Sequence, residues 1–171
     1  METVTRQQIT AVFAVDNTGG MGLNGKLPWP RNADDMRWFK HLTTNQIVVM
    51  GRTTWDSPDM PTPLPNRRNV VITNSPLNIN GVEEISGNIK DALYALHAQN
   101  AVQRIFVIGG ANVLLQAKPA LQCVYITKIP GDYKCNTTLN LAEFLIGFEL
   151  VASYELNTCK VEKYETIQTS T

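Results

Sequence analysis

Short runs of apolar, often β-branched residues recur along the chain, separated by polar, glycine-rich or proline-rich segments. Runs of this length, bounded by turn residues, are typical of buried β-strands. The expected strands cover residues 8–15, 46–50, 69–73, 82–85, 104–108 and 121–127. Two later segments, 148–154 and 158–166, predict a closing hairpin that turns through Leu156 and Asn157.

Helices are expected between the earlier strands. The range 88–100 carries an apolar stripe at helical spacing, and a second helix should run from the glycine pair at 109–110 to about Lys118, before Pro119. A third should begin near Asn32, a plausible cap. Strands that alternate with helices and are then followed by strands alone predict a mainly parallel sheet with an antiparallel end. We find no internal repeat or low-complexity linker, so we expect one domain over residues 1–171.

The segment 27–42 carries two adjacent carboxylates in the first turn of its predicted helix. Helical spacing aligns Asp34 with polar residues and Asp35 with the apolar row. Asp34 is therefore interpreted as a solvated residue that complements the helix dipole, and Asp35 as a carboxylate turned towards the core or a pocket. An inward carboxylate needs a hydrogen-bond donor. Either a ligand supplies that donor, or the helix N-terminus and a nearby hydroxyl satisfy it structurally.

Composition and charge exclude several classes of function. The 171 residues include 15 basic and 15 acidic side chains, so there is no electrostatic footprint for nucleic acid or an anionic membrane. Three cysteines without CxxC spacing indicate reduced thiols in a cytoplasmic compartment, and with only two histidines no metal site is expected. Residues 1–8 lack the apolar core of a signal peptide, and no apolar run reaches membrane-spanning length.

Three loops that follow predicted strands combine glycine, hydroxyl or basic residues that suit phosphate binding. They are Gly51, Arg52, Thr53 and Thr54; Thr73, Asn74 and Ser75; and Gly109, Gly110, Ala111, Asn112 and Val113. The alternative for each is ordinary turn geometry or helix capping. The chain has neither a GxGxxG fingerprint nor a GxxxxGKS loop, which disfavours an ordinary Rossmann site and a P-loop. The three loops together favour a phosphorylated cofactor.

Two further positions have both a functional and a structural interpretation. Arg67 and Arg68 follow a proline-rich loop over residues 58–65, and are either a solvated basic pair or a source of bidentate binding to a carboxylate. Thr127 ends a predicted strand. Its hydroxyl either reflects strand propensity or is the donor that Asp35 requires.

Six segments, in this order and spacing, resemble the dihydrofolate reductase family. They are AVD followed by a loop and LPW, DDMRWF, VVMGRTTW, LPNRRNVVIT, IFVIGG and VYITKI. The resemblance runs from Ile9 to about Tyr164. It implies an α/β fold with an eight-stranded, mainly parallel sheet, an antiparallel C-terminal end and four flanking helices.

The same resemblance implies an activity. A cytoplasmic monomer would reduce 7,8-dihydrofolate to tetrahydrofolate with NADPH, supplying one-carbon metabolism and thymidylate and purine synthesis. Hydride would pass to pterin C6 and a proton from solvent to N5. Folate analogues would bind the same site as antifolates.

The resemblance also implies roles for individual residues. Asp35 would be the ionisable group at the pterin, Thr127 would bond its carboxylate, Trp29 would order a water, and Leu27 would control solvent access. Substrate contacts would come from Val12, Asp35, Met36, Phe39, Leu64, Arg67, Ile108 and Thr127, with Arg67 holding the glutamate-tail carboxylate. Backbone groups of Ala14 and Met21 would meet the nicotinamide carboxamide. The adenosine-phosphate site would comprise Arg52, Thr53, Thr54, Thr73, Asn74 and Ser75, with Arg52 selecting NADPH over NADH. Gly109, Gly110, Ala111, Asn112 and Val113 would cradle the pyrophosphate.

The chain departs from the family pattern at two places. Leu114 stands where the family usually carries a tyrosine, and residues 136–138 replace an acidic segment in the loop that pairs with the glycine-rich loop 19–25. Two alternatives to the implied activity follow. One is a reductase of the same fold acting on another heterocycle, such as a pyrimidine intermediate of flavin synthesis, against which Asp35 and Arg67 argue. The other is a non-catalytic nucleotide-binding or structural protein that kept the fold, which Leu114 alone favours.

Overall fold

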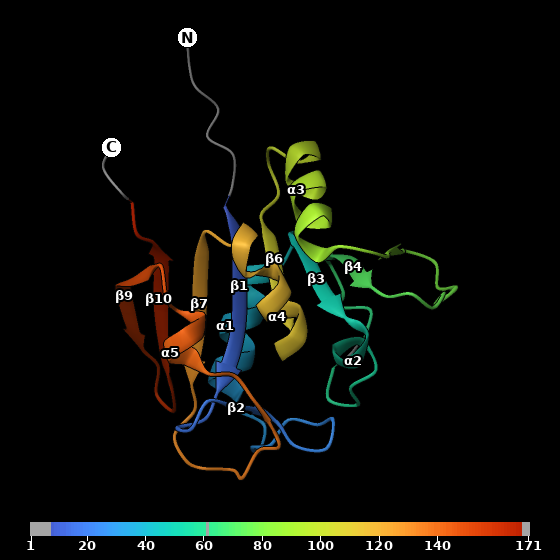
Figure 1. Ribbon diagram of the computed structural model, residues 1–171. Coiled ribbons are helices and arrows are strands. Elements are labelled where there is room, and N and C mark those ends of the chain that lie inside the picture. The colour runs from blue at the N-terminus through green and yellow to red at the C-terminus, as the bar shows by residue number, and fades with distance from the viewer. Residues whose placement is uncertain (1–7, 61, 169–171) are drawn as a thin grey trace.

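The computed structural model describes residues 8–60 and 62–168. The expectation about a signal peptide falls mostly on residues 1–7, and Pro61 of the proline-rich loop is likewise outside the described ranges. Within those ranges an eight-stranded sheet has the order β5-β4-β3-β6-β1-β7-β10-β9 (Figure 1). Its strands are β1 (Ile9–Val15), β3 (Ile47–Gly51), β4 (Arg68–Ile72), β5 (Val82–Ile85), β6 (Ile105–Gly109), β7 (Cys123–Lys128), β9 (Phe148–Glu155) and β10 (Lys160–Thr166).

Strand direction confirms the predicted mixed sheet. The six strands from β5 to β7 pair in parallel, whereas β10 is antiparallel to β7 and β9 is antiparallel to β10. The carboxyl ends of parallel strands lie at one edge of a sheet, so the loops after β1, β3, β4, β6 and β7 gather there. This edge is the lower one in Figure 1.

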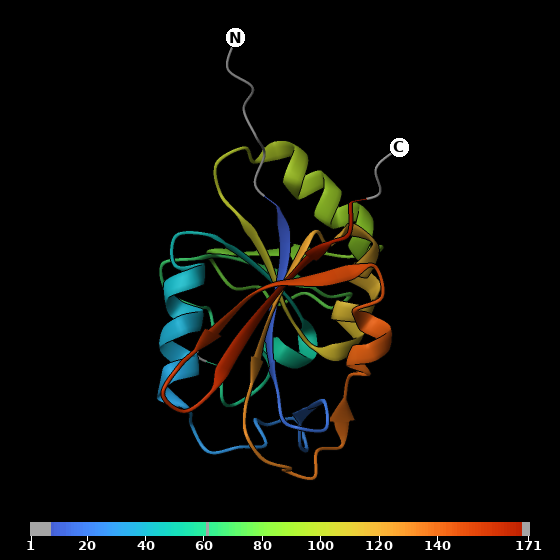
Figure 2. The same ribbon diagram turned by 90° about the vertical axis from the view of Figure 1, so that its left-hand side faces the viewer.

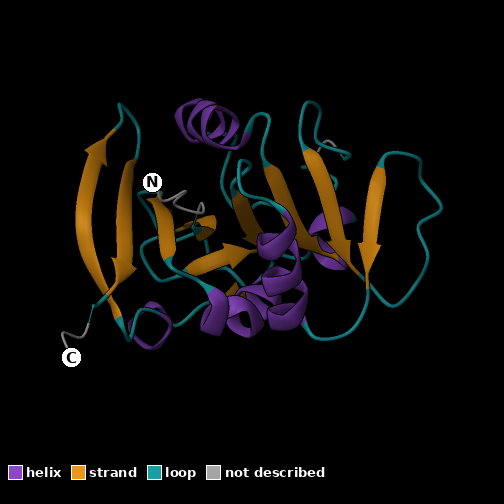
Figure 3. Ribbon diagram, turned by 90° about the horizontal axis from the view of Figure 1, so that it is seen from above, coloured by secondary structure: helices purple, strands orange, loops and turns teal. Residues whose placement is uncertain are grey.

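Helices cover both faces of the sheet, and their packing follows the alternation of side chains along each strand. The helices are α1 (Ala33–Thr43), α2 (Arg52–Trp55), α3 (Ile89–Gln99), α4 (Ala111–Ala117) and α5 (Leu141–Phe144), with a 3₁₀ turn η1 (Lys118–Ala120). On β1, Phe13 and Val15 pack in a cluster with α3, α4 and α5, whereas Val12 packs in the opposite cluster with α1. Figures 2 and 3 show α1 on one side of the twisted sheet and α3, α4 and α5 across from it.

Helix α1 begins where the sequence predicts. Asn32 has extended backbone angles, and its side-chain oxygen accepts from the backbone N–H of Asp35 at 2.9 Å. This is an N-cap hydrogen bond, which satisfies one of the free donors of the first turn.

The glycine-rich loop pairs with the loop that follows β7. Strands β2 (Gly20–Gly22) and β8 (Thr137–Thr138) form a two-stranded antiparallel sheet. Beside it, the Asn136 amide accepts from the backbone N–H of Asn24 at 3.1 Å and donates to the Asn24 side chain at 2.8 Å. A pair of asparagines therefore links the two loops beside this small sheet.

Two findings bear on the expectations from composition. The three cysteines, Cys123, Cys135 and Cys159, are all free thiols. In the part of the chain that the structure describes, no helix combines the length and apolar character needed to cross a membrane.

Candidate active site

Asp35 and Thr127 come together from distant parts of the chain. The first turn of α1 holds Asp35 half-buried, and β7 holds Thr127 almost fully buried beside Ala14 of β1. Burial raises the pKa of the Asp35 carboxyl group, while a side-chain hydrogen bond with Thr127 acts in the opposite direction. The structure thus pairs the inward carboxylate with the hydroxyl expected beside it.

Apolar side chains lie around this carboxylate on the α1 face of the sheet. Val12, Leu64 and Ile108 are buried in one cluster, and Phe39 packs against it. By contrast, Met36 on α1 and Leu27 on the preceding loop remain 38% and 46% exposed. Uncovered apolar groups near a desolvated carboxylate suit a flat heterocycle that also donates hydrogen bonds.

The Leu27 loop is tied to the proline-rich loop. The backbone N–H of Leu27 donates to the Asp59 carboxylate at 2.8 Å, although the two residues lie 32 positions apart. Behind this loop Trp29 is buried, with its ring edge against Tyr133 at a centroid distance of 6.0 Å. Leu27 is therefore held by its backbone while its side chain stays exposed.

Arg67 is a half-buried cation without an anionic partner. Its guanidinium donates to the Pro65 carbonyl at 2.9 Å and to the Thr43 hydroxyl at 3.1 Å, and lies 5.9 Å from the Phe39 ring centroid. Burial lowers the pKa of Arg67, and among the described residues no carboxylate lies within ion-pair distance of it. Arg68, in contrast, is bound to Glu83 at 2.6 and 2.9 Å. Arg67 is therefore the one of the two that can bind a ligand carboxylate.

Asn69 fixes the loop that carries Arg67, a role that sequence analysis missed. Its amide is buried, accepts from Leu64 N–H at 2.9 Å and donates to the carbonyls of Leu64 and Arg67 at 3.0 and 2.9 Å. The only signal in the sequence is an amide at the start of a buried strand.

The three predicted phosphate loops meet at the lower edge of the sheet. A methyl group placed on Gly109 would lie 3.5 Å from the Thr54 hydroxyl oxygen, and one on Gly110 would lie 3.7 Å from the same atom. Arg52 donates to the Ser75 carbonyl at 3.4 Å and pairs with Asp56 at 3.0 Å. The loops after β3, β4 and β6 are therefore neighbours, as expected from the parallel strands.

This junction fits the phosphates of a dinucleotide. Gly109 has φ of +125°, a backbone conformation that favours glycine. No side chain caps α4, so the N–H groups of its first turn are left for an anion. The exposed cation Arg52 lies at the same edge. Thr73 has a local role, because its hydroxyl donates to the Ser75 carbonyl and accepts from the Ser75 N–H, each at 3.1 Å.

Leu114 is not at the open edge of this site. It has no exposed surface and packs in the core cluster on the α3 and α4 face. A tyrosine in its place would have to move its neighbours. Leu114 is thus an integral part of the core packing.

Asp16 is a buried carboxylate whose importance the sequence analysis missed. It is 1% exposed and accepts from the backbone N–H groups of Thr18 and Gly20 at 2.9 Å and of Tyr133 at 3.0 Å, and from the Thr18 hydroxyl at 2.8 Å. Burial acts to raise the pKa of Asp16, but the backbone hydrogen bonds from Tyr133, Gly20 and Thr18 outweigh it and hold the pKa well below its usual range. An aspartate two residues before a hydroxyl in a glycine-containing turn is the available signal.

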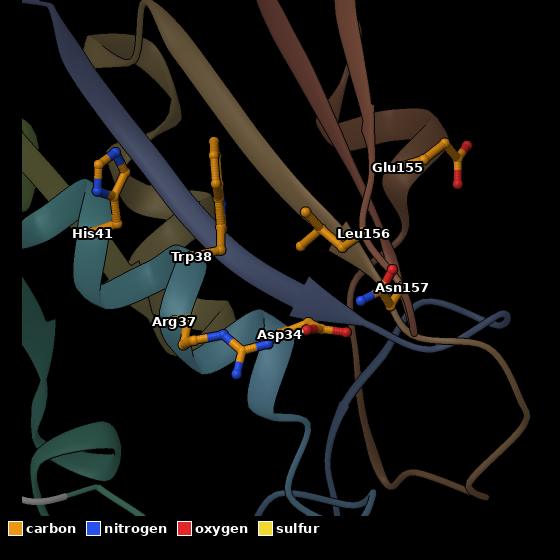
Figure 4. Close-up of a pocket in the computed structure, with 7 residues that line it drawn as sticks. All are labelled: Asp34, Arg37, Trp38, His41, Glu155, Leu156 and Asn157. Atoms are coloured by element: carbon orange, nitrogen blue, oxygen red, sulfur yellow. Dashed lines mark hydrogen bonds and ion pairs between the residues drawn. The ribbon is translucent and has the colours of Figure 1, made fainter.

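The polar side of α1 faces a cleft of about 380 Å³ that is separate from the predicted site. Its lining residues come from α1 and the end of the β9–β10 hairpin: Asp34, Arg37, Trp38, His41, Glu155, Leu156 and Asn157 (Figure 4). The interpretation of Asp34 as solvated is wrong. Its side chain is only 12% exposed and accepts from the backbone N–H and the hydroxyl of Thr158.

Comparisons with known proteins agree with this geometry. A family model described as dihydrofolate reductase matches residues 8–168. Dihydrofolate reductase type 8 of Escherichia coli is 29% identical over 147 residues, covering 83% of this chain and 86% of that protein. The dihydrofolate reductase of Cryptococcus neoformans is 32% identical over 168 residues, covering 77% and 73%. A bifunctional dihydrofolate reductase-thymidylate synthase of Paramecium tetraurelia is 35% identical over 138 residues, which span 80% of this chain but 29% of the relative.

A solved structure shows the same fold. Dihydrofolate reductase from Enterococcus faecalis, complexed with NADP(H) and RAB-propyl, matches with a TM-score of 0.80 at 25% identity, covering 94% of this chain and 97% of that one. Because the family match runs through residues 8–168, the chain belongs to the dihydrofolate reductase family.

Proposed function

We propose that this protein, as a single domain, reduces 7,8-dihydrofolate to 5,6,7,8-tetrahydrofolate with NADPH and so serves one-carbon metabolism. The observation that carries the proposal is the desolvated Asp35 carboxylate, paired with Thr127 on the face where α1 packs on the sheet. The names of the relatives and the NADP(H) in the Enterococcus faecalis structure support it.

Asp35 binds and orients the pterin. Its two oxygens accept from the 2-amino group and N3–H, a fork-like donor pair that matches a carboxylate. Because burial raises the pKa of Asp35, its carboxyl group is better able to assist protonation near neutral pH than an exposed aspartate. Thr127 fixes the carboxylate, and Trp29 orders a water beside it.

The remaining residues position the substrate and exclude water. Met36, Phe39 and Leu64 line the ring system, the carbonyls of Val12 and Ile108 face the pterin, and Leu27 limits access of solvent to N5. NADPH, when bound, supplies the hydride for C6. Ala14 and Met21 would meet its carboxamide through backbone groups, and the three loops after β3, β4 and β6 would hold its phosphates.

The proposal is tested by spectrophotometric measurement of NADPH oxidation with dihydrofolate. Prompt turnover is expected. Turnover of a pyrimidine intermediate of flavin synthesis in preference to dihydrofolate would favour the alternative reductase. Binding of NADPH without oxidation by either substrate would favour the non-catalytic alternative.

Substitution of alanine for Arg52 is expected to weaken the binding of NADPH far more than the binding of NADH. Loss of a charge-assisted bond to the 2′-phosphate costs about 1.5–3 kcal/mol, on the order of 10- to 100-fold in affinity. Fluorescence titration with both nucleotides measures the ratio, and NADH serves as the internal control because it lacks that phosphate. An unchanged NADPH/NADH ratio would remove Arg52 from this role.

Substitution of alanine for Arg67 is expected to raise the KM for dihydrofolate by on the order of 10- to 100-fold, because the tail carboxylate loses a charge-assisted partner. Asn69 still holds the loop backbone in this variant. Binding of a pterin without a glutamate tail should not change. The matched control is Arg68→Ala, since Arg68 is bound to Glu83. Equal effects of the two substitutions on KM would contradict the assignment.

A further inference from the structure

The turn of the β9–β10 hairpin is bound to the first turn of α1. The Asp34 carboxylate accepts from the Thr158 backbone N–H at 3.0 Å and from its hydroxyl at 2.6 Å. The cap residue Asn32 also faces this turn, with its side-chain oxygen 3.2 Å from the Thr158 hydroxyl and 3.8 Å from the Cys159 sulfur. Two segments 124 positions apart thus share one hydrogen-bond cluster immediately before Asp35.

The same hairpin also contacts the strand that carries Thr127, the hydrogen-bond partner of Asp35. Strand β10 pairs antiparallel with β7, with Val161 opposite Thr127. Cys159, between the turn and this pair, is buried against Trp29 and Ile129. Burial and the charges of Asp35 and Asp34 raise the pKa of the Cys159 thiol to about 11. A single short segment therefore links the helix that carries Asp35 to the strand that carries Thr127.

The contact between Asp34 and Thr158 is specific, because the Asp34 carboxylate has few other partners. Its side chain is 12% exposed, and Arg37 pairs with it from the side of the open cleft. Hydrogen bonds from the Thr158 hydroxyl and backbone contribute to holding the pKa of Asp34 below its usual value. In Figure 4 the Asp34 carboxylate points from α1 towards the end of the hairpin. An acceptor that binds both the hydroxyl and the backbone N–H of one residue fixes the separation of the two elements.

We propose that Asp34 and Thr158 are positioning residues that hold the Asp35 carboxylate beside Thr127 and out of bulk water, an inference that rests on the proposed function of Asp35. Neither residue touches substrate. Misplacement of a catalytic group by about 1 Å costs on the order of 100-fold in rate. Hydrogen bonds that hold Asp34 therefore affect catalysis through the position of the adjacent Asp35.

The test compares two substitutions of Thr158 in the full chain. Thr158→Val removes the hydroxyl and keeps the shape, whereas Thr158→Ser keeps the hydroxyl. Thr158→Val is expected to lower kcat/KM for dihydrofolate by about 10- to 100-fold while the affinity for NADPH stays unchanged. Thr158→Ser should retain a kcat/KM close to that of the wild type. The matched control is Thr44→Val, which removes a hydroxyl bond to the Lys40 carbonyl at the far end of the same helix.

A second readout does not depend on turnover. The pKa of Asp35, followed by NMR of its carboxyl carbon in the ligand-free protein, should fall in Thr158→Val as the carboxylate gains water, and stay unchanged in Thr44→Val. The ionisable groups near it, Asp34 on α1 and Cys159 just before β10, are present in both variants. An unchanged Asp35 pKa in Thr158→Val would overturn the proposal. So would a Thr158→Val variant that loses as much stability as Thr44→Val but shows no selective loss of kcat/KM for dihydrofolate relative to NADPH affinity. An inactive wild-type protein whose Asp35 pKa still responds to Thr158 would overturn the proposed function instead.

Discussion

Asp35→Asn is expected to lower the turnover of dihydrofolate by on the order of 10²- to 10⁴-fold and to leave the affinity for NADPH unchanged. Asparagine has nearly the same shape, but it offers one acceptor where the pterin presents two donors, and it cannot take up a proton. Steady-state kinetics and fluorescence titration measure the two quantities. Activity close to that of the wild type would remove Asp35 from its role.

The same substitution is expected to stabilise the ligand-free protein near neutral pH. Burial raises the pKa of Asp35 above its ordinary value of 3.8, so the native state binds more protons than the unfolded state in the window just above that value. Stability contributed by this group is therefore present below pH 3.8 and is lost as the pH rises through the folded-state pKa. Asparagine removes this pH dependence, and thermal unfolding should show a higher Tm for Asp35→Asn at pH 7.

The neighbouring carboxylate is the matched control for this effect. Hydrogen bonds from Thr158 lower the pKa of Asp34, so Asp34→Asn should lower Tm at pH 7. Adjacent aspartates are thus expected to shift Tm in opposite directions. Shifts of the same sign would contradict the account of their environments.

Much of the fold could be predicted because its signals are local. Apolar runs between turn residues gave the strands, and Asn32 before a helical pattern gave the start of α1. The inward direction of Asp35 followed from the spacing of apolar residues on its helix. Convergence of the three phosphate loops followed from strand direction alone, because parallel strands end at one edge.

What could not be predicted depends on partners distant in sequence. The spacing that placed Asp34 on a polar face gave no sign of Thr158, which lies 124 positions away. Asn69 bonds backbone carbonyl and N–H groups of the preceding loop, and backbone partners leave no mark in a sequence pattern. Likewise, Arg67 and Arg68 are adjacent residues of the same type, and only the folded chain shows that Arg68 forms an ion pair with Glu83.

Asp16 is the strongest example of such a partner set, because it joins the glycine-rich loop to the loop after β7. One carboxylate oxygen accepts from Thr18 and Gly20, and the other accepts from Tyr133. The backbone packs so closely here that a methyl group on Gly20 would overlap the Cys135 sulfur.

Asp16→Ala is therefore expected to lower the free energy of unfolding by about 3–5 kcal/mol, because it leaves several buried N–H groups unpaired. The matched control is Asp132→Ala, which removes an exposed carboxylate of the same loop that bonds Lys134 and should change stability far less than Asp16→Ala. Urea unfolding measures both. The folded-state pKa of Asp16 is depressed, so its contribution is present above the ordinary value of 3.8 and is lost as the pH falls through the folded-state pKa. The gap between wild type and Asp16→Ala should then narrow below pH 3.8, and a gap that stays constant in acid would show that the charge of Asp16 does not hold the two loops together.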